Sequence, residues 1–196
     1  MTFQGDYTAH FRAQLNRLKT ENRYRHFVEL ERIVGRHPVA LRHHNGAAQE
    51  VTVWCSNDYL GMGQHPAVIA AMCEVAAEGG TGAGGTRNIS GTSHALVSLE
   101  DELASLHGKE RALAFTSGYV ANEASLTALA MQLPEALILS DSMNHASIIS
   151  GIKLSRAEKA IFRHNDVAHL EEILAAQPID RPKIIVFESV YSMDGD

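Results

Sequence analysis

The strongest constraint on the fold is an alternation of strand-like and helix-like segments in the second half of the chain. Short apolar runs that suit buried strands occur at 111–115, 136–140, 160–163 and 183–188. Segments with helical periodicity fill the gaps between them, at 119–131, 145–155 and 166–176. Strands that alternate with helices form a parallel sheet with helices packed on its faces. The sequence therefore predicts an α/β fold with a mainly parallel sheet.

The first part of the chain predicts a different set of elements. Residues 7–20 carry apolar side chains at helical spacing and predict an amphipathic helix that needs a partner surface. Residues 22–50 are rich in Arg, His and Gly and are expected to wrap over another part of the protein. Residues 51–54 predict a short strand. Two further helices are expected, one from Pro66 to the glycine pair 79–80 and one over 93–108 with a hydroxyl residue as its cap.

The composition indicates what this chain does not bind. Seventeen Lys and Arg against 23 Asp and Glu give a formal net charge of −6, so nothing favours nucleic acid or an anionic membrane surface. Cys55 and Cys73 suggest neither a disulfide framework nor a zinc site, and we expect each to be a buried small hydrophobe. No apolar run approaches the ~20 residues of a membrane span, and the N-terminus lacks a signal-peptide pattern. We expect a cytoplasmic protein.

A literal G-x-G-x-x-G occurs within residues 80–85. The dinucleotide fingerprint needs a strand before the glycines and a helix starting at them, whereas here a helix precedes them and no helical periodicity follows. A P-loop also fails, because no Lys-Ser or Lys-Thr pair follows. Two interpretations remain. The segment is a flexible loop, or its backbone lies close to a ligand or subunit, with Thr86, Arg87 and Asn88 supplying polar contacts.

Three of the predicted strand ends carry residues suited to chemistry. Residues 116–119, Thr-Ser-Gly-Tyr, could bind an anion at a helix N-terminus, although an N-cap alone would also select Ser or Thr. Polar residues end the next strand at 140–145, and Glu188 and Ser192 follow the last strand. Parallel strands place these junctions at one sheet edge, which predicts an active site there. His145 is either a cap or core residue, or a flat ring over a phosphate-anchored ligand, and no second His or Cys lies at metal-ligand spacing.

Several long motifs resemble those of the α-oxoamine synthases, which are pyridoxal-phosphate enzymes of fold type I that join an amino acid to an acyl-CoA. The motifs are WCSNDYLG at 54–61, GGTRNISGT at 84–92, DSMNHAS at 141–147 and ESVYSMDGD at 188–196. Two others, NRYRHF at 22–27 and IFRHNDV at 161–167, are most similar to one branch. That branch condenses glycine with succinyl-CoA to 5-aminolevulinate, CoA and CO2, the first step of heme biosynthesis. The resemblance covers nearly the whole chain.

The resemblance implies that pyridoxal 5′-phosphate is the cofactor and that the three junctions bind it. Backbone N–H groups of Ser117, Gly118 and Tyr119 would hold its phosphate. His145 would stack on the pyridine ring as the catalytic residue within this chain. Glu188 would lie beside the ring, and Ser192 would contact the cofactor near its ring oxygen.

The resemblance also implies substrate contacts and a homodimer. Asn57 would help to hold the glycine carboxylate. The succinyl carboxylate would be received by Arg25, Thr86 and Asn88, and a guanidinium suits this role because its planar fork matches a carboxylate. Ser140 and Lys159 would contact the acyl-CoA. Arg25 and part of the glycine-rich segment would act across the dimer interface.

The same resemblance implies that catalytic groups lie outside this sequence. The family places its Schiff-base lysine and the acid that pairs the pyridine nitrogen downstream of the last motif, and neither Lys153 nor Lys159 matches that lysine. We therefore expect residues 1–50 to form a helix and an arm and residues 51–196 to form the first part of a cofactor-binding large domain, inactive without the rest. Two alternatives stay open. One is a related synthase with a different amino acid or acyl-CoA, and the other is a noncatalytic CoA- or nucleotide-binding α/β module.

Overall fold

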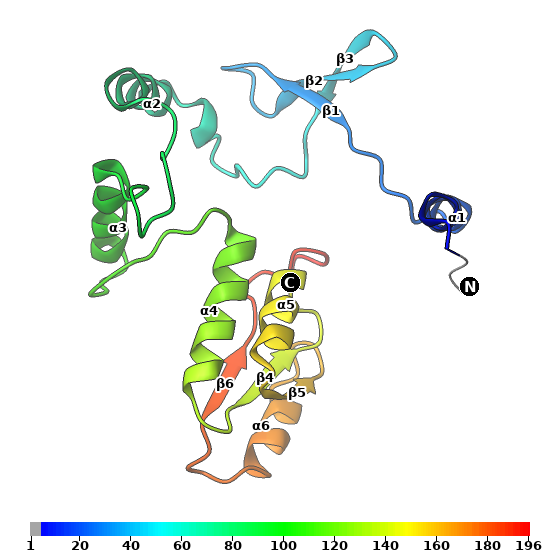
Figure 1. The fold of residues 1–196 in the computed structure, drawn as a ribbon, viewed down its shortest axis with the longest axis vertical. Coiled ribbons are helices and arrows are strands. Elements are labelled where there is room, and N and C mark those ends of the chain that lie inside the picture. The colour runs from blue at the N-terminus through cyan, green and yellow to red at the C-terminus, as the bar shows by residue number, and fades with distance from the viewer. Residues whose placement is uncertain (1–4) are drawn as a thin grey trace. The chain divides into compact units, whose positions relative to one another are not determined.

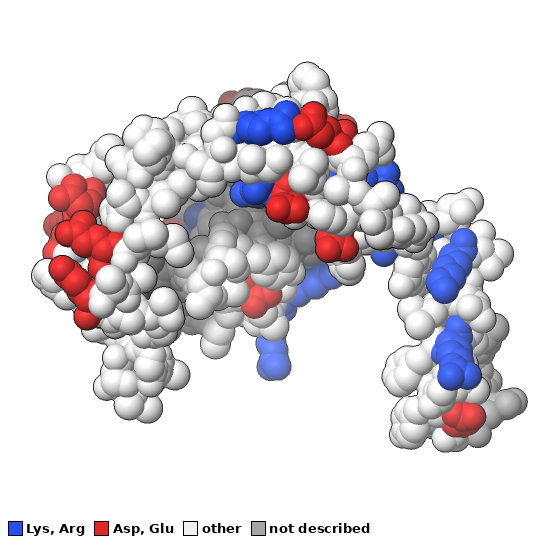
Figure 2. Space-filling view, turned by 90° about the horizontal axis from the view of Figure 1, so that it is seen from above, with Lys and Arg blue, Asp and Glu red and all other residues white. Residues whose placement is uncertain are grey.

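The structure is a computed structural model that describes residues 5–196. These residues form two compact units, an amino-terminal one that ends at Gly82 and a carboxyl-terminal one from Ala83 to Asp196 (Figure 1). No helix among the described residues is both long enough and apolar enough to cross a membrane. Figure 2 shows both acidic and basic side chains at several separate places on the visible surface.

The amino-terminal unit confirms both predicted helices and adds a small sheet. The helices are α1, Tyr7–Thr20, and α2, Pro66–Gly79. A short 3-10 helix, η1, Met62–Gln64, precedes α2. The sheet is antiparallel, in the order of its strands β1, Glu29–Arg32, β2, Val39–His44, and β3, Ala47–Thr52. The strand expected at 51–54 therefore begins four residues earlier and ends at Thr52.

The sequence analysis did not predict the hairpin between β2 and β3. Asn45 and Gly46 form its turn, with φ values of 50° and 77°. Both central residues of a type I′ turn need positive φ, and Asn-Gly is the pair that adopts it most readily. The apolar side chains of the flanking strands are consecutive in VALRHH and irregularly spaced in AAQEVT, so the usual alternation of a strand was missing from this segment. The turn dipeptide was the available signal.

The carboxyl-terminal unit has the α/β architecture that the alternation predicted. Its helices are α3, His94–Leu106, α4, Gly118–Gln132, α5, Ala146–Ser155, and α6, Val167–Ala175. Its strands are β4, Leu137–Asp141, β5, Glu158–Phe162, and β6, Lys183–Val186. They form a parallel sheet in the order β5-β4-β6. The fold-class prediction of a mainly parallel sheet with helices around it is confirmed.

One predicted strand is absent from this sheet. Residues 111–115 run without helix or strand structure, so that prediction was wrong for the described chain. A strand is defined by backbone pairing to a neighbour. The backbone of Ala114 is bonded instead to side chains: its N–H donates to Glu100 Oε1 at 2.7 Å, and its carbonyl accepts from Arg87 at 3.3 Å.

The core of this unit lies on both faces of β4. On one face Ile138 packs with Ala130 of α4 and with Ile148 and Ile152 of α5. Leu137 and Leu139 point to the other face, where they pack with Phe162 and residues of α6. Alternate residues of a strand point to opposite faces, and a central parallel strand with helices on both sides is apolar on both. This packing fixes the carboxyl ends of the strands, where the polar residues begin.

Helices α4 and α5 lie against each other at close range. A Cβ atom added to Gly151 of α5 would lie 2.9 Å from the carbonyl oxygen of Glu123 and 3.0 Å from Leu126 Cβ in α4. Thr127 Oγ1 donates to the Gly151 carbonyl oxygen at 3.2 Å, and Asn122 Nδ2 donates to Ser147 Oγ at 3.0 Å. The contact sets the N-terminus of α4 beside the N-terminus of α5.

Candidate active site

The N-terminus of α4 presents backbone donors to solvent. The Ser117 hydroxyl caps the helix by accepting from the Val120 N–H at 3.2 Å. The N–H groups of Gly118 and Tyr119 belong to the first turn, where a helix has no intrahelical acceptor for them. All three predicted residues are exposed, and a Cβ atom at Gly118 would meet open space. The helix dipole adds partial positive charge here, so this end of α4 can receive a phosphate.

His145 caps the neighbouring helix α5 and has a defined tautomer. Its Nδ1 accepts from the Ser147 N–H at 3.2 Å and lies 2.7 Å from Ser147 Oγ. Because a backbone N–H can only donate, Nδ1 is unprotonated and the ring proton resides on Nε2. The imidazole is exposed, and its centroid lies 6.2 Å from the Tyr119 ring at an interplanar angle of 75°. An accessible flat ring thus lies beside the helix end that can receive an anion.

The loop after β6 reaches the same place. Glu188 accepts from the His145 N–H through Oε1 at 2.5 Å, which joins two junctions that are 43 residues apart. The Glu188 N–H donates to the hydroxyl of Tyr191 at 3.3 Å. Ser192 is exposed in the turn that follows. The structure therefore brings Tyr119, His145 and Glu188 together at one edge of the sheet. His145 and Glu188 follow parallel strands, and the packing of α4 on α5 places Tyr119 beside them.

Asp141, the last residue of β4, is the centre of the hydrogen bonds at this edge. It is 3% exposed. Oδ1 accepts from the Met143 N–H and lies 2.8 Å from His164 Nδ1, while Oδ2 accepts from the Asn165 N–H at 3.0 Å. Burial raises the pKa of Asp141, but these bonds and one from Tyr191 outweigh it and hold the pKa below the ordinary value for Asp.

His164 extends this network to Asp196. Its Nε2 lies 3.0 Å from Asp196 Oδ2, and its ring meets the ring of Tyr191 edge-on at 4.5 Å. The hydrogen bond to Asp141 raises the pKa of His164, burial opposes the rise, and Asp196 adds to it. Burial also raises the pKa of Tyr191, which is 3% exposed. A cluster of charged and polar side chains thus lies under the loop that carries Ser192.

Sequence reasoning missed this cluster although a signal was present. Residues 163–165 follow β5, so they form a fourth strand-to-helix junction at the edge where only three were counted. Asn144 was also missed. It is 4% exposed, and its Nδ2 donates to Ser140 Oγ at 2.9 Å and to the Val186 carbonyl at 2.8 Å, which ties β4 to β6.

The residues expected to contact acyl-CoA lie on two adjacent strands. Ser140 lies in β4 and is 5% exposed, with its hydroxyl donating to the Asp141 carbonyl. Lys159 lies in β5 opposite Ile138 and is exposed. Their side chains therefore differ in access to solvent.

The glycine-rich segment is fixed by Arg87. Its guanidinium binds both carboxylate oxygens of Glu100 in α3, at 2.5 Å and 2.7 Å, and also reaches the Ala114 carbonyl. The hydrogen bond from Arg87 lowers the pKa of Glu100 to about 2. Thr86 and Asn88 on either side of Arg87 are exposed. Arg87 is therefore committed to structure, and its two neighbours remain open to a ligand.

The other predicted site residues, Arg25 and Asn57, are exposed members of the amino-terminal unit. The cysteines do not follow the sequence expectation. Cys55 and Cys73 are both exposed and unpaired in the described chain, because no described element covers the loop after β3 or the outer face of α2 at these positions. Within residues 5–196 no three His, Cys, Asp or Glu side chains lie close enough to hold a metal ion.

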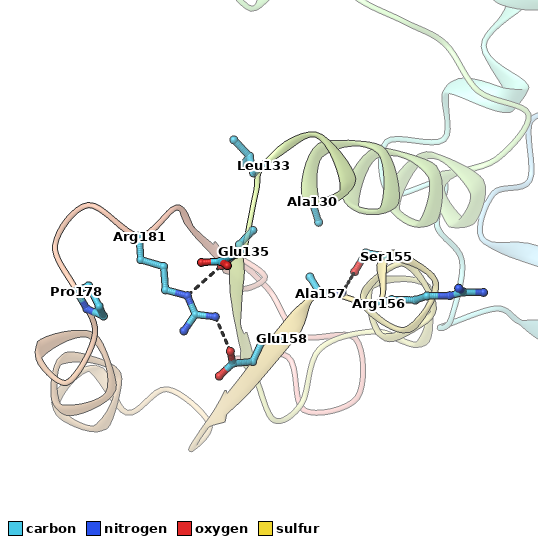
Figure 3. Close-up of a pocket in the computed structure, with 10 residues that line it drawn as sticks. Ala130, Leu133, Glu135, Ser155, Arg156, Ala157, Glu158, Pro178 and Arg181 are labelled. Atoms are coloured by element: carbon cyan, nitrogen blue, oxygen red, sulfur yellow. Dashed lines mark hydrogen bonds and ion pairs between the residues drawn. The ribbon is translucent and has the colours of Figure 1, made fainter.

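A cavity of about 650 Å³ lies at the opposite, amino edge of the same sheet (Figure 3). The guanidinium of Arg181, which lines this cavity, is already paired. Arg181 donates to the Glu135 carbonyl at 3.0 Å and to the Glu158 carboxylate at 2.5 Å, and the close-up shows both bonds inside the cavity. Donors that are already paired leave little for a ligand. The exposed donors and the ring at the carboxyl edge are the better candidate site.

The chain is similar to known proteins over most of its length. The sequence profile of the family "Aminotransferase class I and II" matches residues 49–196. The 5-aminolevulinate synthase of Bradyrhizobium diazoefficiens is 58% identical over 191 residues, which are 97% of this chain and 47% of that protein. The chain therefore spans about half the length of the curated relatives it matches.

Solved structures share the fold over the same extent. Serine palmitoyltransferase of Sphingomonas wittichii superposes with a TM-score of 0.82 at 32% identity, covering 100% of this chain and 47% of that one. A structure of SPT with PLP gives a TM-score of 0.80 at 29% identity, covering 97% and 47%. The fold is thus that of fold type I enzymes, over about half the length of the matched chains.

Proposed function

Because the chain belongs to the class I and II aminotransferase family, we propose that it is the amino-terminal half of a pyridoxal-phosphate-dependent acyltransferase. The complete protein condenses glycine with succinyl-CoA and releases 5-aminolevulinate, CoA and CO2. The observation that carries the proposal is the convergence of the α4 N-terminus, the exposed ring of His145 and the carboxylate of Glu188 at one sheet edge. The identity to 5-aminolevulinate synthases supports the choice of reaction.

The described residues fit pyridoxal phosphate. The N–H groups of Gly118 and Tyr119 and the exposed Ser117 would bind the phosphate, and the open space at Gly118 lets it approach the backbone. His145 would stack on the ring, oriented by Ser147, which is fully buried. When bound, the cofactor supplies an electron sink for the amino acid's α-carbon. The protein supplies position, charge and the exclusion of water.

Glu188 would do two things in this arrangement. Its bond to the His145 N–H fixes the turn that carries the stacking ring. Its carboxylate would also lie beside the cofactor ring, as the family resemblance implies. Ser192, exposed in the next turn, would donate a hydrogen bond to the ring oxygen of the cofactor.

Substrate recognition would use exposed residues, as the family resemblance implies. Arg25, with Thr86 and Asn88, would pair the distal carboxylate of the succinyl group, and Asn57 would hold the glycine carboxylate. The exposure of all four side chains supports this use, since none is committed to a buried contact. Lys159 is an exposed cation suited to the phosphates of CoA. Ser140 would contribute to acyl-CoA binding by stabilising the turn after β4, through the bond that its hydroxyl accepts from Asn144.

We further propose that the complete protein is a cytoplasmic homodimer with its site at the subunit interface. Large apolar side chains lie exposed in the amino-terminal unit, including Phe11 at 61%, Phe27 at 100% and Trp54 at 91%. Exposed apolar surface on this scale is typical of surfaces that another chain or domain covers. We propose that two partners bury this apolar surface. One is the rest of the large domain, which would bring the lysine, and the other is the second protomer. Residues 1–50 would form the arm that reaches the partner.

The test is a product assay with the complete purified protein and added pyridoxal phosphate. Glycine and serine are each offered with succinyl-CoA and with palmitoyl-CoA, and the products are identified by mass spectrometry. We expect 5-aminolevulinate from glycine and succinyl-CoA and no long-chain product from serine. Faster turnover of serine with palmitoyl-CoA would instead assign the chain the reaction of a serine palmitoyltransferase. No turnover of any pair would overturn the proposal.

A further inference from the structure

His164 lies between two carboxylates that belong to different segments. Its Nδ1 is 2.8 Å from Oδ1 of Asp141, at the end of β4. Its Nε2 is 3.0 Å from Oδ2 of Asp196, in the loop after β6. The imidazole therefore has an acceptor at hydrogen-bond distance from each nitrogen. Its side chain is 24% exposed, so water has limited access to replace either partner.

A neutral imidazole cannot satisfy both carboxylates, because it has one N–H donor and one lone pair. The other donors nearby do not change this count. Asn165 Nδ2 lies 3.1 Å from Asp196 Oδ2 but 3.4 Å from His164 Nε2, so its shorter bond goes to the carboxylate. A neutral ring would direct a lone pair at one carboxylate oxygen. The imidazolium donates to both.

The loop that ends at Asp196 carries two of the cofactor contacts. We name residues 187–196 the Ser192 loop. It is closed on itself, since the Tyr191 N–H donates to the Asp196 carbonyl at 3.0 Å and the Gly195 N–H donates to the Tyr191 carbonyl at 2.8 Å. The buried ring of Tyr191 anchors its middle against His164. Ser192 lies between Tyr191 and Asp196, which are hydrogen-bonded to each other. A shift of Asp196 would therefore also shift Ser192.

We propose that His164 is a positioning residue whose imidazolium bridges Asp141 and Asp196 and so holds the Ser192 loop against the carboxyl edge of the sheet. Only one consequence of this inference rests on the proposed function: when the loop is closed, Ser192 and Glu188 are positioned to contact the cofactor. The bridge itself is a property of this chain's own side chains. It makes closure of the loop depend on a proton.

The direction of the pH dependence follows from the groups around the ring. Asp141 from β4 and Asp196 and Tyr191 from the loop face the imidazole, while the nearby Arg163 is paired with Asp166 at 2.7 Å. The two carboxylates favour the charged ring, and the pKa of His164 is raised above its ordinary value. Because the pKa is raised, the bridge is complete below the unfolded-state pKa of His of about 6.5. It is lost as pH rises through the folded-state pKa of His164. The loop should loosen in alkaline solution.

The test is hydrogen exchange of the complete protein without cofactor, measured by mass spectrometry on peptides that cover 187–196. After correction for the intrinsic pH dependence of exchange, protection of this loop should fall about tenfold between pH 6 and pH 9, with a midpoint above 6.5, because one charge-assisted hydrogen bond is lost. Protection of β4 should stay constant over the same range. Protection of the loop that does not vary with pH would overturn the proposal.

Three variants locate the transition. His164→Gln should remove it and leave the loop weakly protected at every pH. Asp196→Asn keeps the ring but removes one carboxylate, so the midpoint should move to lower pH, and this milder change serves if His164→Gln fails to fold. Arg163→Gln is the matched control, since its partner Asp166 lies outside the bridge, and it should keep the wild-type transition. A transition that persists unchanged in His164→Gln would contradict the assignment.

A second readout separates this inference from the proposed function. The dissociation constant of pyridoxal phosphate should rise about tenfold in His164→Gln at pH 6.5, with less effect at pH 9, where the wild-type bridge is already open. If the exchange transition appears but no 5-aminolevulinate forms, the bridge stands and the proposed function fails. If the product forms and the loop shows no transition, the bridge alone is refuted.

Discussion

Replacement of Asp141 by Asn tests the hydrogen-bond network at the sheet edge. The carboxylate is 3% exposed and accepts from the Met143 N–H through Oδ1 and from the Asn165 N–H through Oδ2. An amide has one acceptor oxygen and one NH2 donor, so either orientation of Asn places a donor against a backbone N–H.

The size of the effect follows from what is lost. The N–H of Met143 or of Asn165, each in a part-buried bond, is left without its acceptor, at a cost of about 1 kcal/mol, and the bond from His164 loses the charge on its acceptor. Removal of one partner of a buried charged pair typically costs about 3–5 kcal/mol. We therefore expect Asp141→Asn to lower the free energy of unfolding of the complete protein by about 3–5 kcal/mol.

The assay is urea unfolding followed by circular dichroism, with Asp180→Asn as the matched control. Asp180 is exposed in the loop before β6, so the same chemical change should cost less than about 0.5 kcal/mol there. The depressed pKa of Asp141 also fixes the direction with pH. The contribution of Asp141 to the free energy of unfolding is fully present above its unfolded-state pKa of about 3.9 and is lost as pH falls through its folded-state pKa. The difference in free energy of unfolding between wild type and variant should therefore narrow below about pH 4. Equal stability of Asp141→Asn and the control at pH 7 would refute the reasoning.

Three further changes probe the cofactor site, the substrate site and the packing. His145→Ala should weaken binding of pyridoxal phosphate by roughly 2- to 12-fold, from a stacking contact of about 0.5–1.5 kcal/mol, and alter its visible absorbance; unchanged affinity and spectrum would make His145 structural. Arg25→Leu should reduce the preference for succinyl-CoA over butyryl-CoA in kcat/KM by roughly tenfold to a hundredfold, and equal loss with both would remove Arg25 from acyl recognition. Gly151→Ala should lower stability by about 1–3 kcal/mol because its Cβ would lie 2.9 Å from the Glu123 carbonyl, whereas Gly79→Ala, where a Cβ meets open space, should cost less; equal thermal midpoints would contradict this.

Much of the carboxyl-terminal unit could be predicted from the sequence because its signals are local. The apolar run 136–140 is buried on both faces, so it has the continuous pattern of a central parallel strand. Helix ends were also predictable, because Ser93 and Asp166 cap α3 and α6 with their own side chains. The resemblance read from several motifs is confirmed by the relatives that share this extent of sequence.

Other features depended on contacts that local patterns do not record. Residues 111–115 have the composition of a strand, but the Ala114 backbone is bonded to Arg87 and Glu100, which are distant in sequence. Cys55 and Cys73 are small and apolar, yet burial needs a covering element that the described residues do not supply.

Part of the candidate site was predictable and part was not. The junctions at His145 and Glu188 could be named, because each follows a strand of the parallel sheet, whereas Ser117 reaches the same edge through the packing of α4 on α5. The roles of Asp141 and His164 could not, since they arise from bonds between three segments and from burial, neither of which a motif reports. The junction after β5, which has no hydroxyl residue, therefore belongs to the candidate site as much as the junctions that have one.

A crystal structure of the complete protein with pyridoxal phosphate and glycine tests the central claim most directly. The account predicts the phosphate within hydrogen-bond distance of the Gly118 and Tyr119 N–H groups, the pyridine ring against the imidazole of His145, and Ser192 at the ring oxygen. A cofactor bound elsewhere, for example in the cavity beside Arg181 at the opposite edge, would contradict it. So would a phosphate at α4 with its ring turned away from His145.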